Sequence, residues 1–316
     1  MKIKFQESFK KEIVKLSVFV VTYNQEKYIQ ECLDSILMQK TSFPFEVIVG
    51  DDDSSDSTRK ICEKYANDYS NVNLLPHEKN LGLVENWVRV LSNCKGEYIA
   101  LCEGDDYWID SYKLQKQVDF LEKNNIYSMC VSNRKILIPD GTFNDDIATK
   151  KYYTKEDILN GVIPHTQTMV FRNSNNSAMC KFLVKVLEGL LSDGDRTLAY
   201  WCSLVGDIYI LPDITAVYRW NGIGVWSSHS EVYREFFSIK MFCNFHKRID
   251  YPDRKLFCTC ITNQCLDFIY YNIRRKIKNK YKFETCKLFL KELSFKEIFI
   301  YTSVYLKNKF HKNKSM

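Results

Sequence analysis

The chain has 316 residues, of which 45% are hydrophobic and 27% charged, a balance typical of a globular protein with a sizeable core. This length predicts two domains, or one large domain with an appendage. The net charge of +6 is unevenly spread, because residues 228–316 carry 19 lysines and arginines against 8 acidic residues, and residues 1–227 carry 26 against 31. The longest apolar run near the C-terminus, Ile298–Leu306, is far shorter than the roughly 20 residues that cross a bilayer, which argues against a spanning helix there.

The twelve cysteines are scattered, no two have CxxC spacing, and no histidine cluster accompanies them, which argues against a zinc finger. The segment Met1–Lys15 is charged and has no apolar stretch of the signal-peptide kind. We therefore expect a cytoplasmic protein with reduced thiols, whose basic tail can lie against the inner face of a membrane.

The first half of the chain alternates strand and helix patterns. Leu16–Thr22 is a β-branched apolar run, typical of a strand buried on both faces, and Tyr28–Met38 has its apolar residues on one helical stripe. Further strands are expected at Phe45–Val49, Val72–Leu75 and Tyr98–Cys102, and further helices at 57–69, Leu83–Asn93 and Lys113–Asn124. This alternation predicts an α/β fold with a mostly parallel central sheet and helices on both faces.

The second half shows shorter strand patterns and then only helical ones. Strands are expected at Met129–Val131, Met169–Phe171, Ile208–Leu211 and Ala216–Arg219, and helices at Ala178–Leu191 and Thr197–Val205. From His229 onward the apolar spacing is helical. We expect an α/β domain over residues 1–227 and a basic helical C-terminal extension over residues 228–316.

Polar residues follow three of the predicted strands. They are Thr22-Tyr23-Asn24, Asp51-Asp52-Asp53-Ser54 and Glu103-Gly104-Asp105-Asp106. The carboxyl ends of parallel strands meet at one edge of the sheet, where ligands of such folds bind. One such cluster alone is typical of a turn, but three at one edge favour a binding site.

The third cluster has the chemistry of a cation site. Three carboxylates in a four-residue turn repel one another unless something cationic binds them, and Gly104 allows the sharp turn that lets them converge. Carboxylate oxygens suit Mg²⁺ or Mn²⁺, which complete their shells with water and phosphate. The alternative is a capping turn before the helix at Lys113.

The second cluster has a competing interpretation. An aspartate-rich loop after a buried strand, such as Asp51–Ser55, also fits the nucleophile loop of haloacid-dehalogenase-type phosphatases. That loop normally follows the first strand of its domain, whereas here it follows the second.

Four blocks in order resemble the signature segments of glycosyltransferase family 2, over about residues 14–227. They are Ser17–Asn24, Glu46–Thr58, Asn80-Leu81-Gly82 and Gly96–Trp108. The resemblance implies the GT-A fold and transfer of a sugar with inversion. It places Thr22, Tyr23, Asn24, Asp51 and Asp52 around the nucleoside of the donor, with Asn80 and Gly82 beside them. It also matches Glu103, Asp105 and Asp106 to the family's D-x-D motif, with Asp105 as the ligand of Mn²⁺ or Mg²⁺ and glutamate in place of the usual first aspartate.

The resemblance also implies a catalytic base shortly before a later helix. Asp195 is the expected base, and Asp193 is its near competitor. Arg219 could reach the diphosphate, while Asn221 stands where the family often has a histidine. The segment 165–168 (HTQT) could line the acceptor side or be a plain loop.

The expected reaction is a single displacement, in which Asp195 removes the acceptor proton. The expected partners are a nucleotide-sugar donor, most simply a UDP-sugar, and a glycan or lipid-linked acceptor, with no nucleic acid. A sugar-1-phosphate nucleotidyltransferase is the rival enzyme, but its glycine-rich loop is missing from Val20–Gln25. A degenerate nucleotide-sugar-binding module is the rival without catalysis.

The basic extension concentrates positive charge in one short segment. Its members are Arg274, Arg275, Lys276, Lys278, Lys280 and Lys282. Each such charge near an anionic leaflet contributes roughly 1 kcal/mol, so the segment predicts binding to an anionic membrane surface. The alternative is a packing or oligomer element.

Overall fold

The computed structural model describes residues 14–188, 193–222, 224, 227–249, 254–274 and 281–312. The chain divides into two compact units. The first, the α/β unit, comprises residues 1–184 and 189–219, and the second, the helical unit, comprises residues 185–188 and 220–316.

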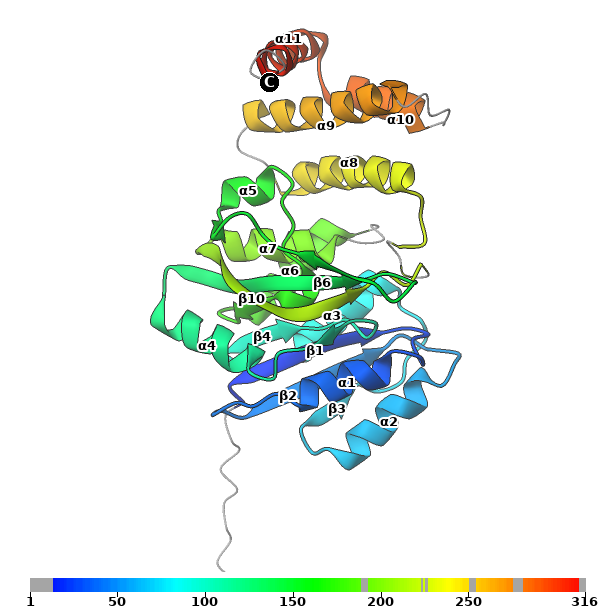
Figure 1. Ribbon diagram of the computed structural model, residues 1–316, viewed down its shortest axis with the longest axis vertical. Helices are drawn as coiled ribbons and strands as arrows, with labels where there is room; N and C mark the ends of the chain where they lie inside the picture. The colour runs from blue at the N-terminus through cyan, green and yellow to red at the C-terminus, as the bar shows by residue number, and fades with distance from the viewer. Residues whose placement is uncertain are drawn as a thin grey trace, which may run out of the picture. The chain divides into compact units, whose positions relative to one another are not determined.

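The α/β unit is built on one sheet with the strand order β3-β2-β1-β4-β9-β6-β10-β5, to which β7 adds beside β6 and β8 beside β10. Figure 1 labels β1, β2, β3, β4, β6 and β10 of this sheet. The strands are β1 (Leu16–Thr22), β2 (Phe45–Asp51), β3 (Val72–Leu74), β4 (Tyr98–Leu101), β5 (Tyr107–Trp108), β6 (Tyr127–Leu137), β7 (Phe143–Asp146), β8 (Tyr152–Tyr153), β9 (Val170–Arg172) and β10 (Asp207–Arg219). Strands β3, β2, β1 and β4 run parallel, as do β6 and β10, while β9 joins the two groups antiparallel. The predicted α/β fold with a parallel core is confirmed.

Helices cover both faces of this sheet. They are α1 (Ile29–Leu37), α2 (Thr58–Asp68), α3 (Leu83–Asn93), α4 (Lys113–Lys123), α5 (Lys155–Leu159), the 3-10 helix η1 (Thr166–Thr168), α6 (Asn176–Leu187) and α7 (Gly194–Ser203). Alternate residues of a strand point to opposite faces. On β1, Val18 and Val20 belong to a core shared with α1, α2 and α4, whereas Phe19 contacts Trp87 of α3, with ring centroids 4.8 Å apart. The strand is therefore buried from both sides, as its β-branched sequence predicts.

Two predictions about the later elements need correction. The strands expected at Ile208–Leu211 and Ala216–Arg219 form the single strand β10, because register shifts at Leu211/Ile214 and Ile214/Ala216 absorb the irregular segment that contains Pro212. The helix expected at Thr197–Val205 begins at Gly194 instead, so Asp195 lies in its first turn rather than before it. Strands β5, β7 and β8 and helix α5 were not predicted from their short sequences.

The helical unit contains α8 (Glu231–Arg248), α9 (Arg254–Arg274), α10 (Tyr281–Glu292) and α11 (Phe295–Lys312). Its core includes Phe242 of α8, Ile261 of α9 and Leu293, which follows α10. Ser294 and Glu297 cap the start of α11 reciprocally, since each side chain accepts the backbone N–H of the other, at 3.3 and 2.8 Å. The prediction of a helical C-terminal region is confirmed.

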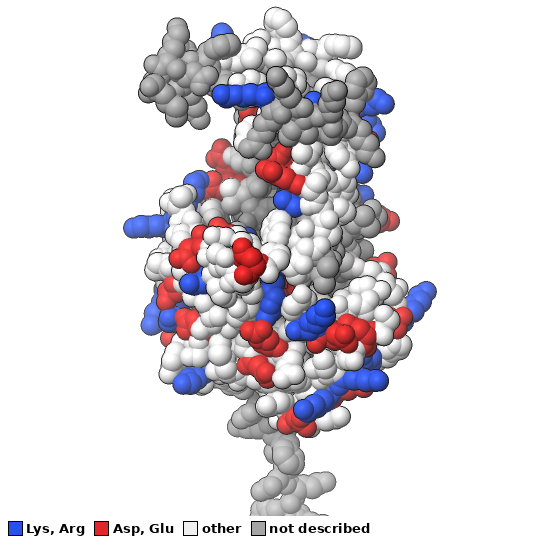
Figure 2. Space-filling view, turned by 45° about the vertical axis from the view of Figure 1, so that its right-hand side comes forward, with Lys and Arg blue, Asp and Glu red and all other residues white. Residues whose placement is uncertain are grey.

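Two further observations bear on the sequence predictions. Eleven of the twelve cysteines are buried, and the structure joins none of the twelve, all of which it describes, in a disulfide. Within the described ranges, no helix combines the length and the apolarity that crossing a membrane requires. On the face that Figure 2 shows, acidic and basic side chains are interspersed over the α/β unit, without an unbroken field of either sign.

Candidate active site

The three polar clusters lie at one edge of the sheet, as the sequence predicts. Thr22 at the end of β1 is the register partner of Asp51 at the end of β2. The backbone N–H of Gly104 donates to the carbonyl of Val21 at 2.9 Å, which brings the acidic turn to the same edge. A Cβ atom on residue 104 would lie 2.9 Å from Thr22 Oγ1 and 2.4 Å from Gln25 Oε1, so the turn requires glycine.

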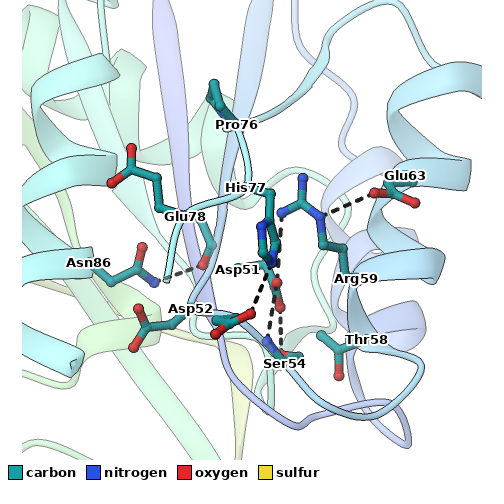
Figure 3. A network of polar contacts seen from close by, with 12 residues as sticks. Asp51, Asp52, Ser54, Thr58, Arg59, Glu63, Pro76, His77, Glu78 and Asn86 are labelled. Carbon is teal, nitrogen blue, oxygen red and sulfur yellow. Dashed lines mark hydrogen bonds and ion pairs between the residues drawn. The ribbon is translucent and has the colours of Figure 1, made fainter. Parts of the chain in front are cut away.

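Asp51 is buried and fixed by neighbours from its own loop and from α2 (Figure 3). Ser54 Oγ donates to Asp51 Oδ1 at 2.5 Å, and Arg59 Nη1 lies 3.7 Å from Asp51 Oδ2. Arg59 also pairs with Glu63, with Nε and Oε1 3.1 Å apart. The carboxylate of Asp51 therefore holds one position at the sheet edge, with a guanidinium beside it.

Asp52 organises the loop that precedes α3. The backbone N–H groups of Leu81 and Gly82 donate to its two carboxylate oxygens at 2.8 and 3.0 Å, and Asn80 Nδ2 donates to its carbonyl at 2.8 Å. Gly82 has a φ of 86°, a conformation that favours glycine. Asn80 and Gly82 thus lie beside the predicted nucleoside residues. Both carboxylate oxygens of Asp52 already accept hydrogen bonds from the backbone of this loop.

The loop after β1 is tied to the loop after β2. Asn24 has a φ of 52°, and its Oδ1 accepts the backbone N–H of Ser55 at 2.8 Å. Thr22 is buried, with its hydroxyl donating to Gln25 Oε1 at 2.8 Å. Tyr23 is 50% exposed, so its ring is the accessible surface of this loop. An exposed ring at this edge can stack on a nucleoside base.

The acidic turn is packed against the end of β10. Asp106 is buried, and its Oδ1 accepts the backbone N–H of Arg219 at 2.9 Å. The guanidinium of Arg219 donates to the carbonyl of Asp105 at 2.6 Å and contacts Glu31. In this conformation Arg219 holds the turn, which is a different role from the expected contact with a diphosphate.

Two carboxyl groups of this turn, those of Glu103 and Asp106, have raised pKa values. Burial raises the pKa of Glu103 to about 8, with further contributions from Asp105 and Asp195. Burial, followed by the charges of Asp105 and Glu103, raises the pKa of Asp106 well above its usual range. The second oxygen of Asp106, Oδ2, is buried without a hydrogen-bond partner among the described residues.

These features fit a hard divalent cation. An orphaned buried carboxylate oxygen beside two further carboxylates is a donor set that Mg²⁺ or Mn²⁺ prefers. Within the described ranges, no three His, Cys, Asp or Glu side chains already converge on one point. A cation held here therefore needs water or phosphate oxygens to complete its shell.

The first turn of α7 brings a fourth carboxylate to the acidic turn. Gly194 lies on the ring of Trp87, where an added Cβ would be 3.1 Å from the indole, and Trp87 also hydrogen-bonds Glu103. Asp195 follows Gly194, and its charge contributes to the raised pKa of Glu103. Burial in turn raises the pKa of Asp195, an effect that the N–H of Arg196 opposes by donating to its Oδ1 at 2.7 Å.

Asp193, the competing candidate, is placed differently. It has a φ of 96° and is buried, and its Oδ1 lies 3.2 Å from Arg196 Nε. Burial raises its pKa to about 6. The ion pair with Arg196 occupies Asp193, whereas Asp195 is the carboxylate whose charge reaches the acidic turn.

The remaining candidates have local roles in the structure. Asn221 Oδ1 accepts from the N–H of Gly224 and the hydroxyl of Ser227, at 2.9 and 3.0 Å, and Val225 and Trp226 lie outside the described residues. Gln167 is buried, and its carbonyl accepts from Trp108 Nε1 at 2.8 Å.

Two residues near the site were missed in the sequence. Trp87 looked like an ordinary apolar position of α3. Arg134 lies in the half of β6 that the sequence did not predict, and its charge lowers the pKa of Asp195. Arg134 is marked as a site residue only by its neighbours in space. These neighbours are distant in the sequence, so no local pattern identifies Arg134.

Comparison with known proteins shows the family to which the chain belongs. Residues 17–178 match the family "Glycosyl transferase family 2", and the chain belongs to that family. The uncharacterized protein Rv1520 of Mycobacterium tuberculosis is 32% identical over 229 residues, which are 71% of this chain and 64% of that protein. The chain thus spans less than two thirds of the length of this relative.

A second relative is the poly(ribitol-phosphate) beta-N-acetylglucosaminyltransferase TarS of Staphylococcus aureus, 38% identical over 117 residues, 36% of this chain and 20% of that protein. The structure of TarS residues 1–349 in complex with UDP-GlcNAc superposes with a TM-score of 0.63 at 20% identity, covering 90% of this chain and 83% of that one. The mannosyltransferase PcManGT of Pyrobaculum calidifontis, in complex with GDP-Man and Mn²⁺, gives 0.56 at 15% identity, covering 95% and 86%. These similarities show the GT-A fold.

Proposed function

We propose that this chain is an inverting glycosyltransferase that moves a sugar from a nucleotide diphosphate sugar to an acceptor hydroxyl during synthesis of a bacterial surface polysaccharide. One observation carries the proposal: Asp195, in the first turn of α7, is near enough to the acidic turn for its charge to raise the pKa of Glu103, which supports a proposed base beside a proposed cation-binding motif. Relatives that act in polysaccharide synthesis support the biological setting.

Each group then has a distinct task. The Asp51 loop and the ring of Tyr23 hold the nucleoside, and Asp105, with Glu103 and Asp106 near it, would hold Mn²⁺ or Mg²⁺ at the diphosphate end. When bound, the metal ion supplies positive charge that neutralises the leaving diphosphate. TarS with UDP-GlcNAc and PcManGT with GDP-Man and Mn²⁺ are the precedents for a nucleotide donor and a metal in this fold, and a UDP-sugar is the donor that we expect.

The reaction follows from the position of Asp195. The acceptor oxygen attacks C1 of the donor sugar, its proton passes to the Asp195 carboxylate, and the bond from C1 to the diphosphate oxygen breaks. Burial raises the pKa of Asp195, which makes its carboxylate a stronger base than an exposed aspartate. One displacement inverts the configuration at C1.

The test is release of free nucleoside diphosphate. Purified protein with Mn²⁺ and each of a panel of nucleotide-sugars should release the diphosphate from at least one donor, and chelation of the metal should stop it. Binding of a nucleotide-sugar without any release would favour the degenerate binding module. Release of pyrophosphate from sugar-1-phosphate and a nucleoside triphosphate would favour the nucleotidyltransferase.

We also propose that the helical unit binds an anionic membrane surface, where lipid-linked acceptors concentrate. Of the basic cluster, Arg275, Lys276, Lys278 and Lys280 lie outside the described residues. Support comes from α11, where Phe295, Phe299 and Leu306 share one face and are 89%, 76% and 46% exposed. Exposed aromatic and aliphatic side chains beside lysines are typical of helices that lie in a bilayer interface.

A vesicle assay tests this. The wild type should bind vesicles with anionic lipid in a salt-sensitive manner, the variant with all six basic residues changed to Gln should lose that binding, and Phe295→Ser/Phe299→Ser should weaken it. Equal binding to neutral and anionic vesicles, or none to either, would contradict the proposal.

A further inference from the structure

A polar cluster on β6 and its neighbours has no part in the reaction described above. Arg134 of β6 donates through Nε to Asp146 Oδ2 of β7 at 2.9 Å, and His165 Nε2 lies 3.1 Å from the same oxygen. Burial, followed by the charge of Arg134, lowers the pKa of His165, so its imidazole is uncharged at neutral pH. Arg134, Asp146 and His165 are called the Arg134 cluster below.

The Arg134 cluster lies beside the proposed active site. The guanidinium of Arg134 is stacked over the ring of Tyr218, 4.8 Å from its centroid. The residue after Tyr218 is Arg219, whose N–H donates to Asp106 at 2.9 Å. Strand β10 therefore joins the cluster to the acidic turn, and the charge of Arg134 reaches Asp195.

The cluster presents both donors and acceptors to an incoming group. Among the residues that the structure describes, the terminal nitrogens of Arg134 donate no hydrogen bond, and Asp146 Oδ1 accepts none. The side chains of Arg134, Asp146 and His165 are 16%, 32% and 33% exposed. A guanidinium holds its N–H groups in a planar fork that fixes the orientation of whatever it binds.

Charge decides which group fits. The positive charge of Arg134 is paired with Asp146, so the cluster is close to neutral, and the neighbouring acidic turn already carries carboxylates that raise each other's pKa. A second anion would add to that repulsion. Hydroxyl groups both donate and accept hydrogen bonds, and they bring no charge.

We propose that the Arg134 cluster and the ring of Tyr218 form the subsite for an uncharged, hydroxyl-rich acceptor group, the sugar or alditol that carries the attacking hydroxyl. Arg134 is a positioning residue that orients this group toward Asp195. The inference rests on the proposed function, since it names the acceptor class for the same site.

A matched pair of probes tests the proposal. Methyl β-D-glucopyranoside and methyl β-D-glucopyranosiduronate share one ring and differ in a CH₂OH against a carboxylate. With Mn²⁺ and UDP present, saturation-transfer NMR should show that the neutral glycoside binds and that the uronate binds less. Binding of the uronate as well as or better than the neutral glycoside, or of neither, would overturn the proposal.

The variants separate this subsite from the donor site. Arg134→Met should weaken binding of the neutral glycoside about tenfold or more, the usual effect of losing hydrogen bonds from a charged donor, and leave the affinity for UDP unchanged. Lys135→Met is the matched control, because Lys135 is the next residue of β6 and pairs with Asp145, 3.5 Å away; it should change neither. Unchanged glycoside binding in Arg134→Met, or equal loss in Lys135→Met, would overturn the proposal.

Two further variants guard against a folding defect. Arg134→Lys keeps the charge but loses the fork, and Asp146→Asn keeps the shape but loses the charge; both should weaken the glycoside and spare UDP. If neither UDP nor any other nucleoside diphosphate binds the wild type, the proposed function is contradicted. If UDP binds, and Arg134→Met, Arg134→Lys and Asp146→Asn all bind the glycoside as the wild type does, only the acceptor subsite is contradicted.

Discussion

The two acidic loops at the edge of the sheet contain the same residue types and differ in what surrounds them. Asp51 and Asp52 receive hydrogen bonds from their own chain, from Ser54 to one and from the backbone of Leu81 and Gly82 to the other. In the turn of Glu103 and Asp106, burial raises both pKa values, and Asp106 Oδ2 has no partner within the described residues.

We interpret the Asp51 loop as a scaffold and the turn of Glu103 and Asp106 as part of the proposed site of reaction. A carboxylate that is already satisfied fixes the loop that carries it, and it stabilises the folded chain without a ligand. A buried carboxylate without a counter-charge destabilises the folded chain until a cation binds or a proton neutralises it. We therefore expect substitutions in the two loops to have different consequences.

The largest expected effect is that of Asp105→Ala. The variant should lose transfer and the Mn²⁺-dependent part of nucleotide binding, because a hard cation loses a charged oxygen ligand. Release of nucleoside diphosphate measures transfer, and calorimetry measures the Mn²⁺-dependent part of nucleotide binding. Asp145→Ala, which removes an aspartate of β7 that pairs with Lys135, is the control. Near-normal turnover of Asp105→Ala would show that Asp105 is not a ligand.

Asp195→Asn should have the next largest effect. The amide keeps the shape and removes the proton acceptor, so turnover should fall by about 10²–10⁴-fold while donor affinity persists. Steady-state kinetics and donor titration measure this. Asp193→Asn is the matched control, two residues away and paired with Arg196. The assignment of the base fails if Asp193→Asn loses turnover and Asp195→Asn keeps it.

In the scaffold loop, Asp51→Ala and Asp52→Ala should weaken nucleoside diphosphate binding without metal. The Asp52 variant should also lower the free energy of unfolding by about 1–3 kcal/mol, since the N–H groups of Leu81 and Gly82 lose their acceptor. Metal-free calorimetry and urea unfolding measure these effects. Unchanged affinity in both variants would limit these aspartates to holding the loop.

The smallest expected effect concerns Lys113, which is fully buried, with its amine 4.4 Å from the centre of the Trp108 ring. Burial lowers its pKa from 10.5 to about 7. Between these two values Lys113 binds more protons in the unfolded chain than in the folded chain, so this residue adds a component of stability that rises as the pH increases from 7 to 10.5.

Lys113→Met should remove this component of the pH dependence of stability. Urea unfolding at several pH values measures the free energy of unfolding of both proteins. The exposed Lys116→Met is the control and should keep the wild-type slope. The same slope in Lys113→Met and the wild type would contradict the explanation.

The sequence predicted the scaffold better than the site. Strands β1 and β2 are buried runs of β-branched residues, and the amphipathic pattern of Leu83–Asn93 matches α3 residue for residue. These features are local. Strand β10 was split because Pro212 is a turn signal, and only its pairing with β6 and the register shifts there show one strand.

Roles at the site depend on contacts between distant residues. From the sequence, Arg219 could reach a diphosphate or be solvated, and its partners in the structure, Asp105 and Glu31, are over a hundred residues away. Arg134 is a candidate site residue only because it stacks on Tyr218 and its charge affects the pKa of Asp195, and no local sequence pattern marks it. The residue types at the site could therefore be predicted from the sequence. The different roles that we propose for the two acidic loops could be assigned only from the structure.

The proposed difference in role between the two acidic loops is tested most directly by calorimetric titration of UDP, with and without Mn²⁺. The titration compares the wild type with Asp51→Ala and Asp105→Ala. Mn²⁺ should strengthen UDP binding in the wild type and in Asp51→Ala, although the latter should bind more weakly throughout, and Mn²⁺ should have no effect in Asp105→Ala. Persistence of the Mn²⁺ effect in Asp105→Ala, or its loss in Asp51→Ala alone, would show that the roles of the two loops are assigned wrongly.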